Sequence, residues 1–117
     1  MRRKALRSLE AARRLLAMGF VDEAASRTYF ALFQAGVHGL EKQGLKPGDF
    51  RAGATHWEHR TVARSAERIR GEPSDVDLFE RARDLRLTSD YNRDSVLRKD
   101  LEFLRYRIER FVLEVTA

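Results

Sequence analysis

Apolar residues recur every three or four positions along most of the chain, which places them on one face of an α-helix. No stretch of any length has the alternating pattern of a β-strand. The pattern therefore predicts a single-domain, all-α fold, an up-and-down bundle of four to five helices. We expect helices from Arg3 to Met18, from Asp22 to Gln43, from Thr55 to Gly71, from Pro73-Ser74 past Ser89, and from Ser95 to Val115.

Glycine and proline mark the predicted breaks between these helices. They cluster in residues 44–48 and 71–73, and Gly19 marks an earlier break. The clearest start signal is Thr55 followed by Glu58, the pattern of a capping box, in which each side chain binds a backbone N–H of the first turn. We therefore expect the third helix to begin at Thr55 and to end at Gly71.

The chain has 117 residues and no cysteine. This length suits one domain with a modest core. The absence of thiols excludes disulfides, a cysteine-based zinc site and a thiol nucleophile. The apolar runs are far too short to span a bilayer, and Arg13 and Arg14 interrupt the apolar residues that follow the basic N-terminus. We expect a cytoplasmic protein without a membrane partner.

Arginine dominates the charge of the chain. Lysine and arginine number 23 against 18 aspartates and glutamates, which gives a net charge of +5. Guanidinium groups bind phosphate and carboxylate well, so the excess favours an anionic partner such as RNA or a nucleotide. Solvated helix faces rich in arginine would give the same composition. A solvated face is the better interpretation for Arg105, Arg107 and Arg110, because Glu102 and Glu109 lie within helical reach.

Two of the predicted helices carry polar residues close to their apolar faces. On the fourth helix, Arg86 and Asp90 lie four positions apart, so their side chains can touch. On the second helix, Ser26 and Tyr29 lie one turn apart, with Arg27 beside them. Buried charge costs free energy unless it is paired. Facing helices would bring together Arg86, Asp90, Tyr91, Ser26 and Tyr29, either as a ligand site or as a network that fixes the register of the helices.

Three segments of the chain contain short sequence motifs that hydrophobic spacing does not explain. They are Ser26-Arg27-Thr28-Tyr29-Phe30-Ala31-Leu32-Phe33, Thr55-His56 and Arg86-Leu87-Thr88-Ser89-Asp90-Tyr91. Together they resemble the small single-domain branch of the HEPN-domain family, over nearly the whole chain and in the family's order. The resemblance implies an α-helical bundle that forms a homodimer. It also implies a minimal nucleotidyltransferase as partner, in a toxin–antitoxin-like two-component system.

Active members of that family are metal-independent ribonucleases, in which an arginine is followed after four to six residues by a histidine. The arginine would stabilise charge on the scissile phosphate, and the histidine would move protons during attack by the ribose 2′-hydroxyl. In this chain Arg86 matches the arginine, but the histidine is missing. Tyr91, Asn92 and Arg93 stand in its place, and no histidine follows His59.

The leading interpretation is therefore a HEPN module that binds a nucleotide or an RNA phosphate and pairs with a nucleotidyltransferase. Its ligand-binding residues would be Ser26, Arg27, Tyr29, Arg86 and His56. One alternative is a divergent ribonuclease whose catalytic residues are Arg86, Asp90 and Tyr91. Another is a purely structural interaction protein, in which these polar residues only fix the packing. Whether the chain is an enzyme is left open by its sequence.

His56 and His59 lie three positions apart on the expected first turn of the third helix, a spacing that can hold a metal ion on one face. No nearby residue clearly supplies a third ligand, because Glu58 is explained by the capping box. We therefore expect neither a metal site nor a cofactor.

Large aromatic residues predict an oligomer. Phe20, Phe30, Phe50 and Trp57 are more than one small bundle needs in its core. Some of them should form an exposed patch, which a two-fold homodimer would cover.

Overall fold

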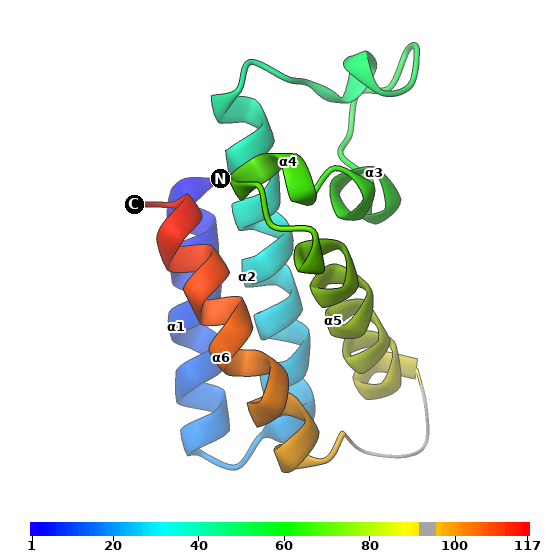
Figure 1. Cartoon of the computed structure of the whole chain (residues 1–117). Helices are drawn as coiled ribbons and strands as arrows, with labels where there is room; N and C mark the ends of the chain where they lie inside the picture. The colour runs from blue at the N-terminus through cyan, green and yellow to red at the C-terminus, as the bar shows by residue number, and fades with distance from the viewer. Residues whose placement is uncertain (92–95) are drawn as a thin grey trace.

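The computed structural model describes residues 1–91 and 96–117, and the side chain of Tyr91 lies outside the described part. Within these residues the chain is helical and contains no strand, so the predicted all-α class is confirmed. The helices are α1 (Arg2–Ala17), α2 (Val21–Lys42), the 3-10 turn η1 (Pro47–Asp49), α3 (His59–Arg64), α4 (Glu67–Arg70), α5 (Ser74–Tyr91) and α6 (Arg98–Val115). Figure 1 shows that α1, α2, α5 and α6 alternate in direction, while α3 and α4 run across one end of the bundle.

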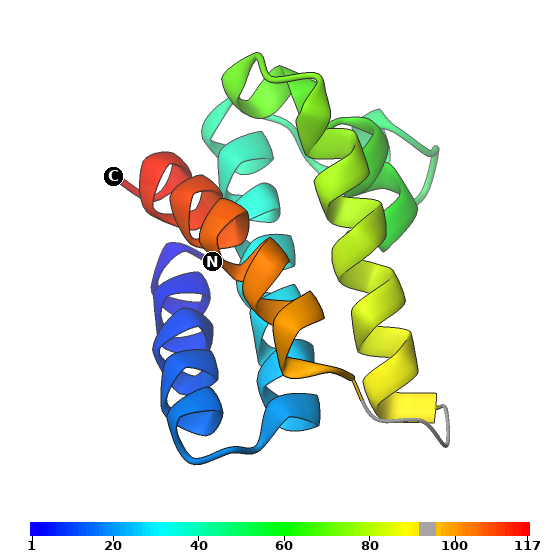
Figure 2. The ribbon, with the colours of Figure 1, turned by 60° about the horizontal axis from the view of Figure 1, so that its bottom comes forward.

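Helix α2 forms the centre of the bundle, since α1, α5 and α6 all pack against it (Figures 1 and 2). Two glycines of α2 also allow α3 and α4 to approach it closely. A Cβ atom at Gly36 would lie 2.7 Å from the Val62 side chain, and one at Gly39 would lie 2.5 Å from Ile69. Both positions therefore have to stay small for α3 and α4 to reach the centre of the fold.

The predicted third helix is divided in two, which brings the observed count of α-helices in the described residues to six rather than four or five. Helix α3 ends at Arg64, and its C-cap Ser65 has ψ of 0°. Helix α4 is a single turn, and its C-cap Gly71 has φ of 73°. The predicted end at Gly71 is confirmed, because a positive φ suits glycine there.

The predicted capping box at Thr55 is wrong. Helix α3 begins at His59, four residues later, and Glu58 is its N-cap without a side-chain cap hydrogen bond. Thr55 lies exposed in the preceding loop. The carboxylate of Glu58 instead pairs with Arg51 at 2.9 Å. The first turn of α3 instead begins with His59, whose ring contacts Tyr29 of α2.

Helix α6 also begins later than predicted. Leu97 is its N-cap in an extended conformation and Arg98 is its first residue. Ser95, the predicted start, lies outside the described residues. The starts predicted for the other long helices differ from the observed ones by at most one residue.

A buried ion pair fastens α4 to α5 and α6. Asp75 is 1% exposed and accepts two hydrogen bonds from Arg70, at 2.7 and 2.8 Å. A further nitrogen of Arg70 donates to Glu114 of α6 at 2.8 Å. The hydrogen bonds to Asp75 raise the pKa of Arg70, so the guanidinium stays charged. This paired geometry offsets the cost of burying Asp75.

The predicted aromatic patch is found only in part. Phe20 is 51% exposed, but Phe30, Phe50 and Trp57 are half-buried, and the last two pack on each other. The most exposed large aromatic side chains, Phe103 and Tyr106, lie on α6 instead. In the described part of the chain, no helix is both long enough and apolar enough to cross a membrane.

Candidate functional site

The guanidinium of Arg86 lies against two aromatic rings of α2. Its central carbon is 4.8 Å from the ring centre of Phe30 and 5.2 Å from that of Tyr29. The two rings meet edge to face with their centres 5.5 Å apart. A cation over aromatic faces is attracted by their negative π-systems. This stack joins α5 to α2 where the sequence predicted a shared polar site.

Asp90 pairs with Arg86 from the next turn of α5. The Asp90 Oδ2 and Arg86 Nε atoms lie 3.2 Å apart, and the two side chains are 30% and 26% exposed. The Nε–H of Arg86 is nevertheless not aligned for a hydrogen bond. The pair is thus a partly exposed charge contact, and the fully buried pair considered from the sequence is not what the structure contains.

Tyr29 and His59 form the innermost polar contact of the site. The Tyr29 side chain is buried, and its hydroxyl lies 2.8 Å from Nδ1 of His59. On the other side of the ring, Nε2 of His59 lies 3.4 Å from Glu80 Oε1. The neutral histidine with its proton on Nε2 satisfies both neighbours, because it accepts from the tyrosine and donates toward the carboxylate.

Burial shifts the pKa of both members of this contact. Desolvation raises the pKa of Tyr29 above its ordinary value of 10.0, although nearby Arg86 and Arg83 oppose the shift. Desolvation also lowers the pKa of His59 below 6.5, although Glu80 acts in the opposite direction. Both groups are therefore uncharged at neutral pH, and His59 gains a charge only when a new anion or a lower pH favours it.

His59 lines a polar hollow of about 530 Å³ between α3 and α5, which we call the basic hollow. Its other lining residues are Arg60, Arg64, Glu80 and Arg83. Three arginines against one glutamate give it a formal charge of +2 with His59 neutral. None of these arginines has an ion-pair partner among the described residues. All three arginines are exposed to solvent.

A second hollow, of about 460 Å³, lies where α1, α2 and α5 meet, and we call it the mixed hollow. It is lined by Leu15, Glu23, Ser26, Arg27, Phe30 and Asp90. Its surface combines an aliphatic side chain and an aromatic ring with a hydroxyl, two carboxylates and one guanidinium. Arg86 joins the two hollows, because it contacts both Phe30 and the tyrosine that binds His59.

The structure brings together most of the residues that the sequence singled out. Ser26, Arg27 and Asp90 share the mixed hollow, while Tyr29 and Arg86 stack beside it. The prediction for the side chain of Tyr91 falls outside the described residues.

His56 is the exception, because it lies exposed in the loop before α3 and lines neither hollow. His59, three residues later, occupies the place expected for it. Sequence reasoning also missed Arg60, Arg64 and Arg83. The only available signal was spacing, since Glu80, Arg83 and Arg86 follow one another at intervals of three on one helix.

The two histidines do not form the metal-binding pair that their spacing allowed, since only His59 belongs to α3. Across residues 1–91 and 96–117, no three side chains of the types His, Cys, Asp or Glu gather in a way that could hold a metal ion.

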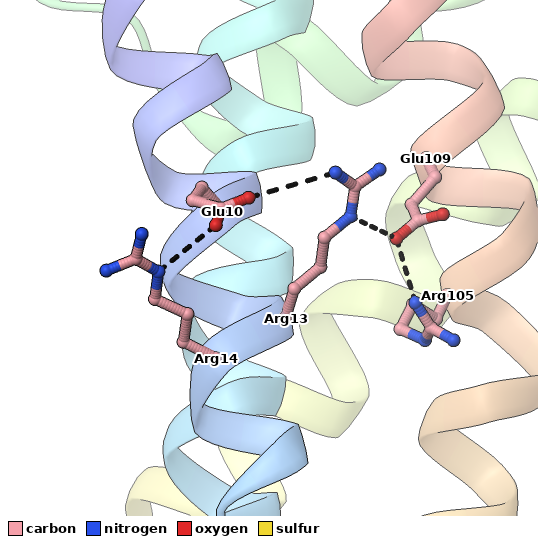
Figure 3. Close-up of polar contacts among 5 residues, drawn as sticks. All are labelled: Glu10, Arg13, Arg14, Arg105 and Glu109. Carbon is pink, nitrogen blue, oxygen red and sulfur yellow. Dashed lines mark hydrogen bonds and ion pairs between the residues drawn. The ribbon is translucent and has the colours of Figure 1, made fainter.

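Another arginine-rich surface lies between α1 and α6, and each of its arginines has a carboxylate partner (Figure 3). Glu109 of α6 accepts from Arg13 at 3.0 Å and from Arg105 at 2.8 Å, so it links the two helices. Glu10 pairs with Arg14 at 3.1 Å. The expected pairing of Arg105 with Glu109 is present, but both side chains are only partly exposed, and Glu102 pairs with Arg98 instead.

Comparison of the chain with protein-family models, with curated proteins and with solved structures gave no match.

Proposed function

We propose that the chain binds phosphate groups of RNA or of a nucleotide in the basic hollow between α3 and α5. The observation that carries this proposal is the convergence of Arg60, Arg64 and Arg83 on one concave surface without ion-pair partners among the described residues. Guanidinium groups bind phosphate oxygens through paired N–H donors, and these bonds are strongest when both sides are charged.

His59 and Glu80 would tune this site. In the tautomer that satisfies Tyr29, the N–H of His59 is directed toward the hollow edge, where Glu80 accepts it weakly at 3.4 Å. A phosphate is a better acceptor in this basic environment and would displace the glutamate. The nearby anion would then favour the charged form of His59.

The biological setting of the proposal comes from the resemblance to HEPN domains alone. On that basis, the chain would act in the cytoplasm as a homodimer and as the partner of a minimal nucleotidyltransferase in a toxin–antitoxin-like pair. Co-expression with such a nucleotidyltransferase, followed by co-purification and sedimentation, tests this part. A chain that stays monomeric and alone at micromolar concentration would contradict it.

Titration of the protein with a short single-stranded RNA, followed by calorimetry, tests the binding itself. Arg83→Ala should weaken binding about tenfold, or about 1.4 kcal/mol, because it removes one charged donor pair. Arg14→Ala is the matched control, since it removes the same charge from the exposed pair with Glu10. Equal losses in both variants would mean that only net charge matters and would reject a defined site.

The position of His59 supports cleavage of RNA as a second candidate function. In its charged form, which a bound phosphate favours, His59 could donate its Nε2 proton to the leaving 5′-oxygen while the arginines stabilise the phosphorane charge. The ribose 2′-hydroxyl would lose its proton to water and attack the phosphorus, which forms a 2′,3′-cyclic phosphate and expels the 5′-oxygen with the proton from His59. Cleavage that resists EDTA and disappears in His59→Gln would establish it. Binding without products would leave the chain as a binding module.

A further inference from the structure

We infer that the mixed hollow is a nucleoside subsite, which binds the base and ribose of the same RNA strand whose phosphate occupies the basic hollow. The inference rests on the proposed phosphate site and names its ligand more narrowly, as a single-stranded oligonucleotide rather than a mononucleotide. It assigns functions to Arg27 and Glu23, to which the phosphate site gives none.

The chemistry of the mixed hollow fits a nucleoside better than an anion. Its two carboxylates, Glu23 and Asp90, balance Arg27 and the adjacent Arg86, which pairs with Asp90, so it offers no excess positive charge to a phosphate. Leu15 and Phe30 provide an apolar surface for a base, and Arg27 can lie flat on a base face. The carboxylates are suitable acceptors for ribose hydroxyl groups.

The two hollows lie in one line along α5. Glu80 and Arg83 line the basic hollow, and Asp90 lines the mixed hollow. Asp90 lies seven positions after Arg83, which is about 10 Å along a helix. Arg86 lies between them in the sequence and contacts Tyr29 and Phe30 on α2. A strand that fills both hollows therefore has to extend beyond a single nucleotide.

The length of the ligand provides the test. Inorganic phosphate, uridine monophosphate and the uridine di- and trinucleotides are titrated into the whole chain by calorimetry. We expect affinity to rise about tenfold between the mononucleotide and the trinucleotide. A trinucleotide of deoxyuridine should bind several-fold more weakly than the uridine trinucleotide, because it lacks the ribose 2′-hydroxyl groups.

Two exposed residues allow the mixed hollow to be altered without disturbing the core. Arg27→Ala and Glu23→Ala should each reduce the gain with length while leaving the affinity for phosphate and for the mononucleotide unchanged. Arg83→Ala is the contrasting variant and should weaken all four ligands alike.

The outcomes separate the two proposals. An affinity that does not rise with length, or a rise that survives both substitutions in the mixed hollow, would overturn the nucleoside subsite and leave the phosphate site standing. Failure of every ligand to bind, phosphate included, would overturn the phosphate site and the subsite with it. Circular dichroism of each variant shows that a loss of binding is not a loss of fold.

Discussion

The arginines of this chain occupy two kinds of surface. Between α1 and α6, Arg13 and Arg105 share the carboxylate of Glu109. Between α3 and α5, the arginines of the basic hollow face solvent, and the one carboxylate among them, Glu80, is directed at His59. Arginine therefore joins two helices on the first surface and remains available to bind an anion on the second. The net charge of the chain does not distinguish these surfaces, whereas the presence or absence of ion-pair partners does.

The largest effect is expected where a paired arginine is also buried. Asp75→Ala removes the two hydrogen bonds that Asp75 accepts from Arg70 and leaves that guanidinium without its main partner. We expect the free energy of unfolding to fall by about 3–5 kcal/mol, measured by urea denaturation. Asp77→Ala breaks the exposed pair with Arg81 and should cost no more than about 1 kcal/mol. Similar losses of unfolding free energy in both variants would contradict the expectation that a buried ion pair contributes more to stability than an exposed one.

The next effect concerns the salt dependence of RNA binding. Each phosphate contact releases counterions, so the logarithm of the binding constant falls with the logarithm of the salt concentration. Arg64→Ala should reduce the magnitude of this slope by about one, because it removes one phosphate contact from the basic hollow. Arg105→Ala, on the paired surface, should leave the slope unchanged. A slope that responds equally to both changes would place the RNA on both surfaces.

A smaller effect is expected for stability at the paired surface. Arg13→Ala breaks the 3.0 Å contact with Glu109, but Arg105 remains to neutralise that carboxylate. The free energy of unfolding should fall by at most about 1 kcal/mol, as for other exposed pairs. Thermal denaturation at low and high salt checks this, since added salt should shrink the difference. A larger loss that salt does not change would mean that packing, not charge, joins α1 to α6.

The smallest effect is a pH dependence at His59. Burial lowers its pKa in the folded chain, so the unfolded chain takes up the proton first as pH falls below about 6.5. Stability is therefore full above that value and declines as pH falls through the folded pKa. His59→Gln should flatten this decline, measured by urea denaturation between neutral and mildly acidic pH. His38, whose pKa burial also lowers, should retain its own share of the slope. An unchanged slope in His59→Gln would contradict the assignment.

Hydrophobic spacing predicted the long helices because it reports a property of each segment alone. The apolar stripe of α2 could be read in this way, and the proline before Ser74 marked the start of α5. The division between α3 and α4 could not be predicted from such spacing. Their short segment is shaped by the space that Gly36 and Gly39 leave beside α2, and that space depends on residues distant in the sequence.

The candidate site was predicted in part for the same reason. Arg86 and Asp90 lie on one helix, so their spacing is sufficient to pair them. The sequence alone did not indicate that His59, rather than His56, reaches the site. The partner of His59 is the hydroxyl of Tyr29, thirty residues away in the sequence. His56 was selected because Thr55-His56 resembles a HEPN motif, and nothing in the local sequence pointed to His59 instead.

The two ends of the chain lie side by side, because Arg2 donates to the carbonyl of Thr116 at 2.7 Å (Figure 2). A short linker could thus join them, and new ends could be opened in the exposed turn around Gly53 without cutting a helix. Such a circular permutant would keep both hollows while reversing the order in which α2 and α5 are synthesised. It would show whether the assembled surfaces depend on chain order or only on the final packing.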